Sequence, residues 1–113
     1  MLTVEALRRY GANVEDGLNR CLNNKAFYFR MIGMALQSDG FEKLKEAVAQ
    51  NDLQAAFEQA HSLKGVLGNL ALTPLFEPVS NMTEELRAKT ERDYSPYLEE
   101  IFKQKALLND LLS

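Results

Sequence analysis

The amino-acid sequence predicts an all-α fold, an antiparallel up-and-down four-helix bundle with a short helical cap at the N-terminus. Three observations lead to this prediction. Apolar residues recur at helical spacing along most of the chain. Most of the three prolines and six glycines stand where helices would begin or end. The connections between the predicted helices are short, which makes neighbouring helices antiparallel.

Two short helices are predicted to form the N-terminal cap. Thr3 is placed to cap a first helix that continues through Arg9, and Gly11 then ends it. Asn13 is placed to cap a second helix that runs to about Leu22. Helices of this length are marginal alone, so we expect both to pack over one end of the bundle.

The next predicted helix, residues 25–36, is apolar over more than half of its circumference. That is wider than the stripe of about 100° that one core-facing surface needs. The excess could be buried under the N-terminal helices or left for a partner.

The remaining helices have recognisable starts and ends. Asn51 or Asp52 is placed to cap a long helix, and Thr73 and Ser95 each precede a proline, which favours a cap followed by proline at the first helical position. The apolar spacing then predicts helices near residues 41–50, 52–70, 73–90 and 95–111.

Length and composition favour one domain spanning residues 1–113. A chain of this size buries roughly 65% of its unfolded surface, so it needs no disulfide or structural metal. The single cysteine, Cys21, cannot form an internal disulfide and suits a reducing compartment, so we expect a cytoplasmic protein. The initial methionine and the absence of linker residues favour a free-standing chain.

The charge pattern excludes several classes of partner. Thirteen basic and sixteen acidic residues leave a net charge of -3, and the basic residues are scattered. We therefore expect no binding to nucleic acid or to an anionic membrane. No signal peptide and no apolar run long enough for a membrane span is visible.

One constellation carries chemistry, and it surrounds the only histidine, His61. Lys64, Gly65 and Gly68 follow at spacings that place them beside the imidazole on one side of a helix. With Leu67 at the centre of the apolar stripe, the imidazole points about a third of a turn away from the core, so we expect it to be at least partly exposed.

These residue types suit phosphoryl transfer. A neutral imidazole presents a nucleophilic nitrogen near pH 7, and the Lys64 ammonium one turn away could offset charge on a phosphoryl group. Glycine inside a helix costs about 0.8–1 kcal/mol relative to alanine, so two within one turn need a compensating role. Gly65 lies off the core stripe and could clear space for an approaching molecule, whereas Gly68 could serve either docking or packing.

Other chemistries fit less well. The pair Glu58 and His61 forms half of a di-iron carboxylate pattern, but one histidine supplies no second half unless a symmetric dimer does. Hydrolytic triads and structural zinc sites fail on the same count of histidines and cysteines. Ser62 stands where a histidine kinase usually has an acidic residue, and no glycine-rich ATP site is present. The main alternative is a helical adaptor that keeps the bundle and transfers no phosphate.

Residues 61–65 (His-Ser-Leu-Lys-Gly), followed by Asn69 and Leu70, resemble the signature of histidine-containing phosphotransfer domains. These domains are intermediates of multistep two-component phosphorelays. The resemblance extends over nearly the whole chain in the order and spacing of the helices. One departure is Ala71, where the family often has glycine, and this difference puts local helix packing in doubt.

The resemblance implies a monomeric phosphoryl carrier rather than a stand-alone enzyme. His61 would accept the phosphoryl group, Lys64 would stabilise its charge, and Gly65, Gly68 and Asn69 would face a docking receiver domain. The partners would be receiver domains of response regulators or hybrid histidine kinases, and the adaptor alternative would bind receiver or other signalling domains. The resemblance would also put part of the docking surface on the predicted helix of residues 25–36, with Tyr28, Phe29, Ile32 and Gly33 as candidates. No metal or cofactor is expected on this chain, because the receiver domain would bring Mg²⁺.

Overall fold

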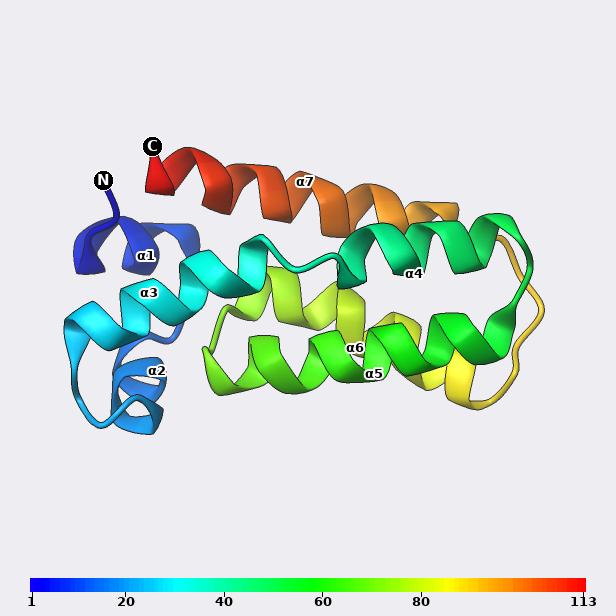
Figure 1. The fold of residues 1–113 in the computed structure, drawn as a ribbon, viewed down its shortest axis with the longest axis horizontal. Coiled ribbons are helices and arrows are strands. Elements are labelled where there is room, and N and C mark those ends of the chain that lie inside the picture. The colour runs from blue at the N-terminus through cyan, green and yellow to red at the C-terminus, as the bar shows by residue number, and fades with distance from the viewer.

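The computed structural model describes all of residues 1–113 as helices and short connections, with no β-strand (Figure 1). The all-α class predicted from the sequence is therefore confirmed. None of the helices is both long and apolar enough to cross a membrane. The seven helices are α1 (Val4–Tyr10), α2 (Val14–Arg20), α3 (Lys25–Leu36), α4 (Gly40–Ala49), α5 (Leu53–Asn69), α6 (Thr73–Arg87) and α7 (Ser95–Leu112).

The four C-terminal helices pack side by side in chain order, with α5 between α4 and α6, and α6 against α7. Helices α4 and α7 also touch, since the rings of Phe41 and Phe102 meet edge to face with centroids 6.4 Å apart. Helix α3 lies end to end with α4 along one side of the molecule and contacts α7 (Figure 1). The result is an elongated body of 40 × 24 × 20 Å.

Helices α1 and α2 lie at one end of this body, with α2 against α3 and α1 against α7 (Figure 1). The predicted caps of both short helices are confirmed. The Thr3 hydroxyl accepts a hydrogen bond from the amide of Ala6 at 3.0 Å, and the Asn13 side chain accepts one from the amide of Asp16 at 3.2 Å. Gly11 ends α1 with a left-handed φ of 113°.

The starts of α6 and α7 differ from the prediction. Thr73 and Ser95 are the first helical residues rather than the caps, and neither cap position carries a side-chain hydrogen bond. The prolines that follow them, Pro74 and Pro96, still fall in the first turn, where a missing amide hydrogen costs nothing. Pro78, in contrast, lies inside α6 and does not mark the start of a helix.

The core lies between α3–α4, α5, α6 and α7, and Ala60 and Leu67 mark the buried face of α5. Two of the residues suggested above for a partner surface, Tyr28 and Ile32, are wholly buried, so that suggestion is wrong for them. The wide apolar surface of α3 is needed because the N-terminal helices cover one side of it while α7 covers another.

A second buried feature, which we call the Tyr28 junction, holds the C-terminal end of α5. The Tyr28 hydroxyl donates to the carbonyl of Leu70 at 2.8 Å, and the amide of Asn13 donates to the carbonyl of Ala71 at 2.9 Å. Gly17 of α2 lies directly against the Tyr28 ring. Carbonyl groups that the end of a helix leaves without partners are thereby satisfied from the N-terminal region.

Ala71 belongs to this junction and has a left-handed backbone, with a φ of 55°. The resemblance to the family predicts that alanine in place of glycine at this position affects local helix packing. The structure shows that backbone conformation matters as well, because a Cβ atom is unfavourable in this region and glycine is the usual residue after a helix C-terminus.

Candidate functional site

His61 lies in the middle of α5 on the side turned away from the core, and its side chain is exposed, as the helical spacing predicted. Gly65 and Asn69 follow at intervals of one turn and are also exposed. These three residues form what we call the α5 ridge. A Cβ atom added at Gly65 would meet nothing within 4 Å, so the surface beside the imidazole is bare.

Lys64 leaves α5 on the side that faces α6. Its ammonium nitrogen lies 3.1 Å from Oε2 of Glu84, and its side chain is 29% exposed. The cation that the sequence placed one turn from His61 therefore has a defined partner on the next helix.

Glu84 binds a second cation as well. Arg87 donates from Nε to Oε1 of Glu84 at 3.3 Å and from Nη2 to Oε2 at 3.4 Å. The hydrogen bonds from Arg87 and from Lys64 lower the pKa of the Glu84 carboxyl group. Glu84 is therefore ionised near neutral pH and carries one negative charge between two positive ones.

The imidazole itself is in contact with an aromatic ring. Phe57, one turn before His61 on α5, stacks on it with ring centroids 5.6 Å apart and an interplanar angle of 19°. The guanidinium carbon of Arg87 lies 5.0 Å from the centroid of the Phe57 ring, within the range of a cation–π interaction. The orientation of His61 is thus linked to α6 through Phe57.

A shallow hollow on the surface brings together the five residues that the sequence assigned to phosphoryl transfer and docking around His61. It lies between α5, the start of α6 and the end of α2. The residues that line it are Arg20, His61, Lys64, Gly65, Gly68, Asn69 and Phe76.

The two glycines of the hollow differ in their surroundings. A Cβ atom at Gly68 would lie 3.1 Å from the ring of Phe76, whereas one at Gly65 would lie in open space. Gly68 therefore has a packing role between α5 and α6, which was one of the two interpretations open from the sequence. Asn69 accepts a weak hydrogen bond from Arg20 at 3.4 Å.

An apolar groove lies on the other side of α5, against α3 and the start of α4. Met34 and Val66 line it and are 59% and 43% exposed. Ser62, next to His61, also lines this groove. The α5 ridge is therefore flanked by a polar hollow on one side and by an apolar groove on the other.

Five residues around the site were not predicted: Arg20, Phe57, Phe76, Glu84 and Arg87. Phe57 could have been found, because a residue four positions before His61 lies on the same face of the helix. The other four come from other helices, and local spacing holds no information on how those helices are aligned with α5.

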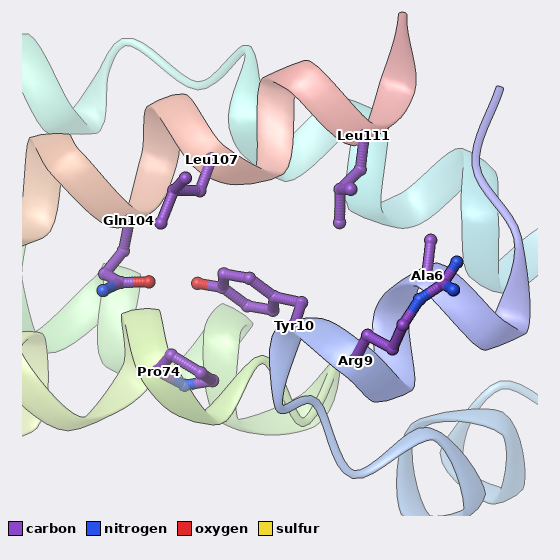
Figure 2. Close-up of a pocket in the computed structure, with 7 residues that line it drawn as sticks. All are labelled: Ala6, Arg9, Tyr10, Pro74, Gln104, Leu107 and Leu111. Carbon is purple, nitrogen blue, oxygen red and sulfur yellow. The ribbon is translucent and has the colours of Figure 1, made fainter.

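No three His, Cys, Asp or Glu side chains gather in a way that could hold a metal ion. Glu58, the acidic residue of the di-iron pattern considered above, accepts a hydrogen bond from Gln54 on its own helix. A further pocket lies between α1, the start of α6 and α7 (Figure 2). The Tyr10 hydroxyl, which is buried and has no partner, points toward Gln104 there, and none of the predicted site residues lines it.

Comparison with known families identifies the class of protein that this fold and site define. The family model of the Hpt domain matches residues 36–113, more than half of the chain, so the chain belongs to the Hpt domain family. The match begins at the last residue of α3 and includes the whole of α5 with His61. No match was found among curated proteins or among solved structures. The family has a role in histidine phosphotransfer in phosphorelays, and its members typically interact with receiver domains.

Proposed function

We propose that this protein carries a phosphoryl group on His61 between the aspartates of receiver domains. The observation that carries the proposal is the position of its only histidine, which is exposed on the α5 ridge within the part that matches the family. The bare surface at Gly65 lets a partner approach the imidazole. We assign α4 to α7 as the family's antiparallel four-helix bundle, extended by α3 and capped by α1 and α2.

The transfer step follows from imidazole chemistry. A neutral ring nitrogen of His61 donates its lone pair to the phosphorus of an aspartyl phosphate on the receiver. The bond between phosphorus and the aspartate oxygen breaks and releases the carboxylate. The product is a phosphoramidate whose other ring nitrogen keeps its proton. Transfer to a second receiver reverses these bond changes.

Lys64 lies one helical turn from the nucleophile and supplies a positive charge there. A cation placed near a transferring phosphoryl group offsets the charge on its oxygens. Mg²⁺ would be bound by the acidic site of the receiver, which would also supply most of the catalytic groups. This chain then acts as a carrier and contributes the nucleophile, a cation and a docking surface.

The docking surface consists of the α5 ridge with the features on either side of it. Gly65 and Asn69 allow close approach, and the exposed Met34 and Val66 provide apolar area beside them. A receiver that covers this surface would exclude water from the transfer step. We expect a monomer, since one histidine and one docking surface per chain are sufficient for this function. We also expect a cytoplasmic protein, because a single cysteine suits a reducing compartment.

The test is a phosphorylation assay with purified components. A receiver domain is phosphorylated by a small phosphodonor in the presence of Mg²⁺, mixed with the protein, and the label is tested for stability in acid and in base. We expect acid-labile, base-stable phosphate on the wild type and none on His61→Gln. The variant should remain folded because His61 is exposed and outside the core.

Two outcomes would contradict the proposal. Label on His61→Gln at the wild-type level would mean that another residue accepts the phosphoryl group. A folded wild-type protein that takes no label from several receivers, yet binds them, would be an adaptor without transfer.

A further inference from the structure

The carboxylate of Glu84 joins two cations close to the His61 site: Lys64, which lines the hollow with His61, and Arg87, which lies over the Phe57 ring that stacks on the imidazole. It bonds the Lys64 ammonium at 3.1 Å and the Arg87 guanidinium at 3.3 Å and 3.4 Å. We propose that Glu84 controls how strongly the phosphoryl group is held on His61, by competing with that group for these two cations. The inference deepens the proposed function and rests on it.

The first step of the argument concerns the position of the cations. Lys64 stands one turn after His61 on the same helix, so its flexible side chain can reach either Glu84 or a group attached to the imidazole. Arg87 lies over Phe57, the ring that stacks on His61. Lys64 therefore borders the histidine directly and Arg87 is separated from it by one aromatic ring, and Glu84 binds both in the unphosphorylated protein.

The second step concerns charge. A phosphoryl group adds about 1.5 to 2 negative charges near pH 7 and three strong acceptor oxygens. It must attract the Lys64 ammonium in competition with Glu84, whose single negative charge is shared between two partners. Glu84 is 53% exposed, and ion pairs at such exposure contribute little, so the exchange of partners is easy.

The consequence is a weaker hold on the phosphoryl group. Glu84 withdraws positive charge from the phosphohistidine and places a negative charge near it, and both effects raise its free energy. A carrier that must pass the group onward benefits from this, because a phosphohistidine stabilised too strongly would retain it. Glu84 is a positioning residue, since it acts through Lys64 and Arg87.

The experiment measures the equilibrium distribution of label between His61 and the aspartate of a receiver. Glu84→Gln should shift it toward phosphohistidine by about threefold or more, a change of roughly 0.7 kcal/mol or more at about 1.4 kcal/mol per tenfold. Glu84→Asp should restore a distribution close to that of the wild type. The melting temperature should be unchanged, because the pairs of Glu84 are exposed.

A matched control is Glu77→Gln. Glu77 is exposed on the same helix, takes part in none of the ion pairs, and lies two turns, or about 10 Å, before Glu84. This variant changes the net charge by the same amount, yet its distribution should match the wild type. In a Lys64→Gln background the effect of Glu84→Gln should shrink, because part of it acts through the ammonium.

The outcomes are distinguishable. An unchanged distribution in Glu84→Gln, or an equal shift in Glu77→Gln, would overturn the role of Glu84 while leaving the carrier function intact. A shift toward the receiver would also overturn it. Absence of label on the wild type would instead reject the carrier function, and the role of Glu84 with it.

Discussion

The two parts of α5 that matter most in this molecule have opposite surroundings. The C-terminal end of α5 is held by the Tyr28 junction, where space is filled. A Cβ atom added there at Gly17 of α2 would lie 2.5 Å from the Tyr28 hydroxyl oxygen. On the α5 ridge, one at Gly65 would meet nothing within 4 Å. Each glycine lies inside a helix, at the same cost in helix propensity. The first makes room for a side chain of the same molecule, whereas the second leaves room for another molecule.

The largest effect on stability is expected from Gly17→Ala. The added methyl group overlaps the Tyr28 ring, whose Cε1 and Cζ atoms would lie 2.6 Å from it, so helix α2 or the buried Tyr28 side chain must shift. Overpacking of this kind costs about 1–3 kcal/mol. Urea unfolding should therefore show a lower free energy of unfolding.

The matched control for this prediction is Gly65→Ala. It should raise the free energy of unfolding by up to about 1 kcal/mol, because alanine favours the helix and its methyl group meets no neighbour. Equal effects of the two substitutions would show that the contrast between the junction and the ridge is wrong.

A large side chain on the ridge should affect transfer rather than folding. Gly65→Gln places a long side chain beside the imidazole, where we expect the receiver to dock. We expect kcat/KM for transfer from a phosphorylated receiver to fall by about tenfold or more, roughly 1.4 kcal/mol in transition-state binding. The time course of labelling at several receiver concentrations measures kcat/KM. Urea unfolding should show no loss of stability. Transfer at the wild-type rate would remove the docking explanation for this glycine.

A smaller effect is expected from Tyr28→Phe, which removes the hydrogen bond to the carbonyl of Leu70. The loss should be about 1 kcal/mol in the free energy of unfolding, since the carbonyl is left without its partner in a buried place. Labelling of His61 should be retained, because the junction lies beyond the end of the ridge. A loss of labelling without a loss of stability would contradict this division of roles.

The same variant has a consequence at high pH. Burial raises the pKa of Tyr28 to about 12, above its ordinary value near 10. The folded state therefore favours the neutral phenol, and this contribution is complete below pH 10 and is lost as the pH rises from about 10 to about 12. Tyr28→Phe should lose less stability over that interval than the wild type. Burial also raises the pKa of Tyr10, so part of the alkaline loss should remain in the variant.

The N-terminal region and the part that matches the family also differ in what they contribute. Residues 36–113 contain His61, Lys64 and Glu84, the carboxylate that pairs with Lys64 and Arg87. The region before them supplies Tyr28, Asn13 and Gly17 to the junction. It therefore completes the hydrogen bonding at the end of the histidine helix, and in addition brings Arg20 to the rim of the hollow.

Much of this protein could be predicted from local features of its sequence. The all-α class, the helix of residues 25–36, the caps at Thr3 and Asn13, and the exposure of His61 all follow from periodicity and capping within single segments. For the long helix the sequence allowed Asn51 or Asp52 as the cap, and the structure has Asp52. The grouping of Lys64 and Gly65 beside His61 follows from 3.6 residues per turn. These properties depend only on residues close together in the chain, so the sequence by itself determined them.

Tertiary structure alone decided the rest. The burial of Tyr28 and Ile32, the contact of Gly68 with Phe76 and the bonds of Glu84 to Lys64 and Arg87 depend on how separate helices are aligned. Local spacing sets which residues share a face of one helix. The axial shift and rotation between two helices instead come from the packing of the whole core, because a small slide along α6 would bring a different residue opposite Lys64.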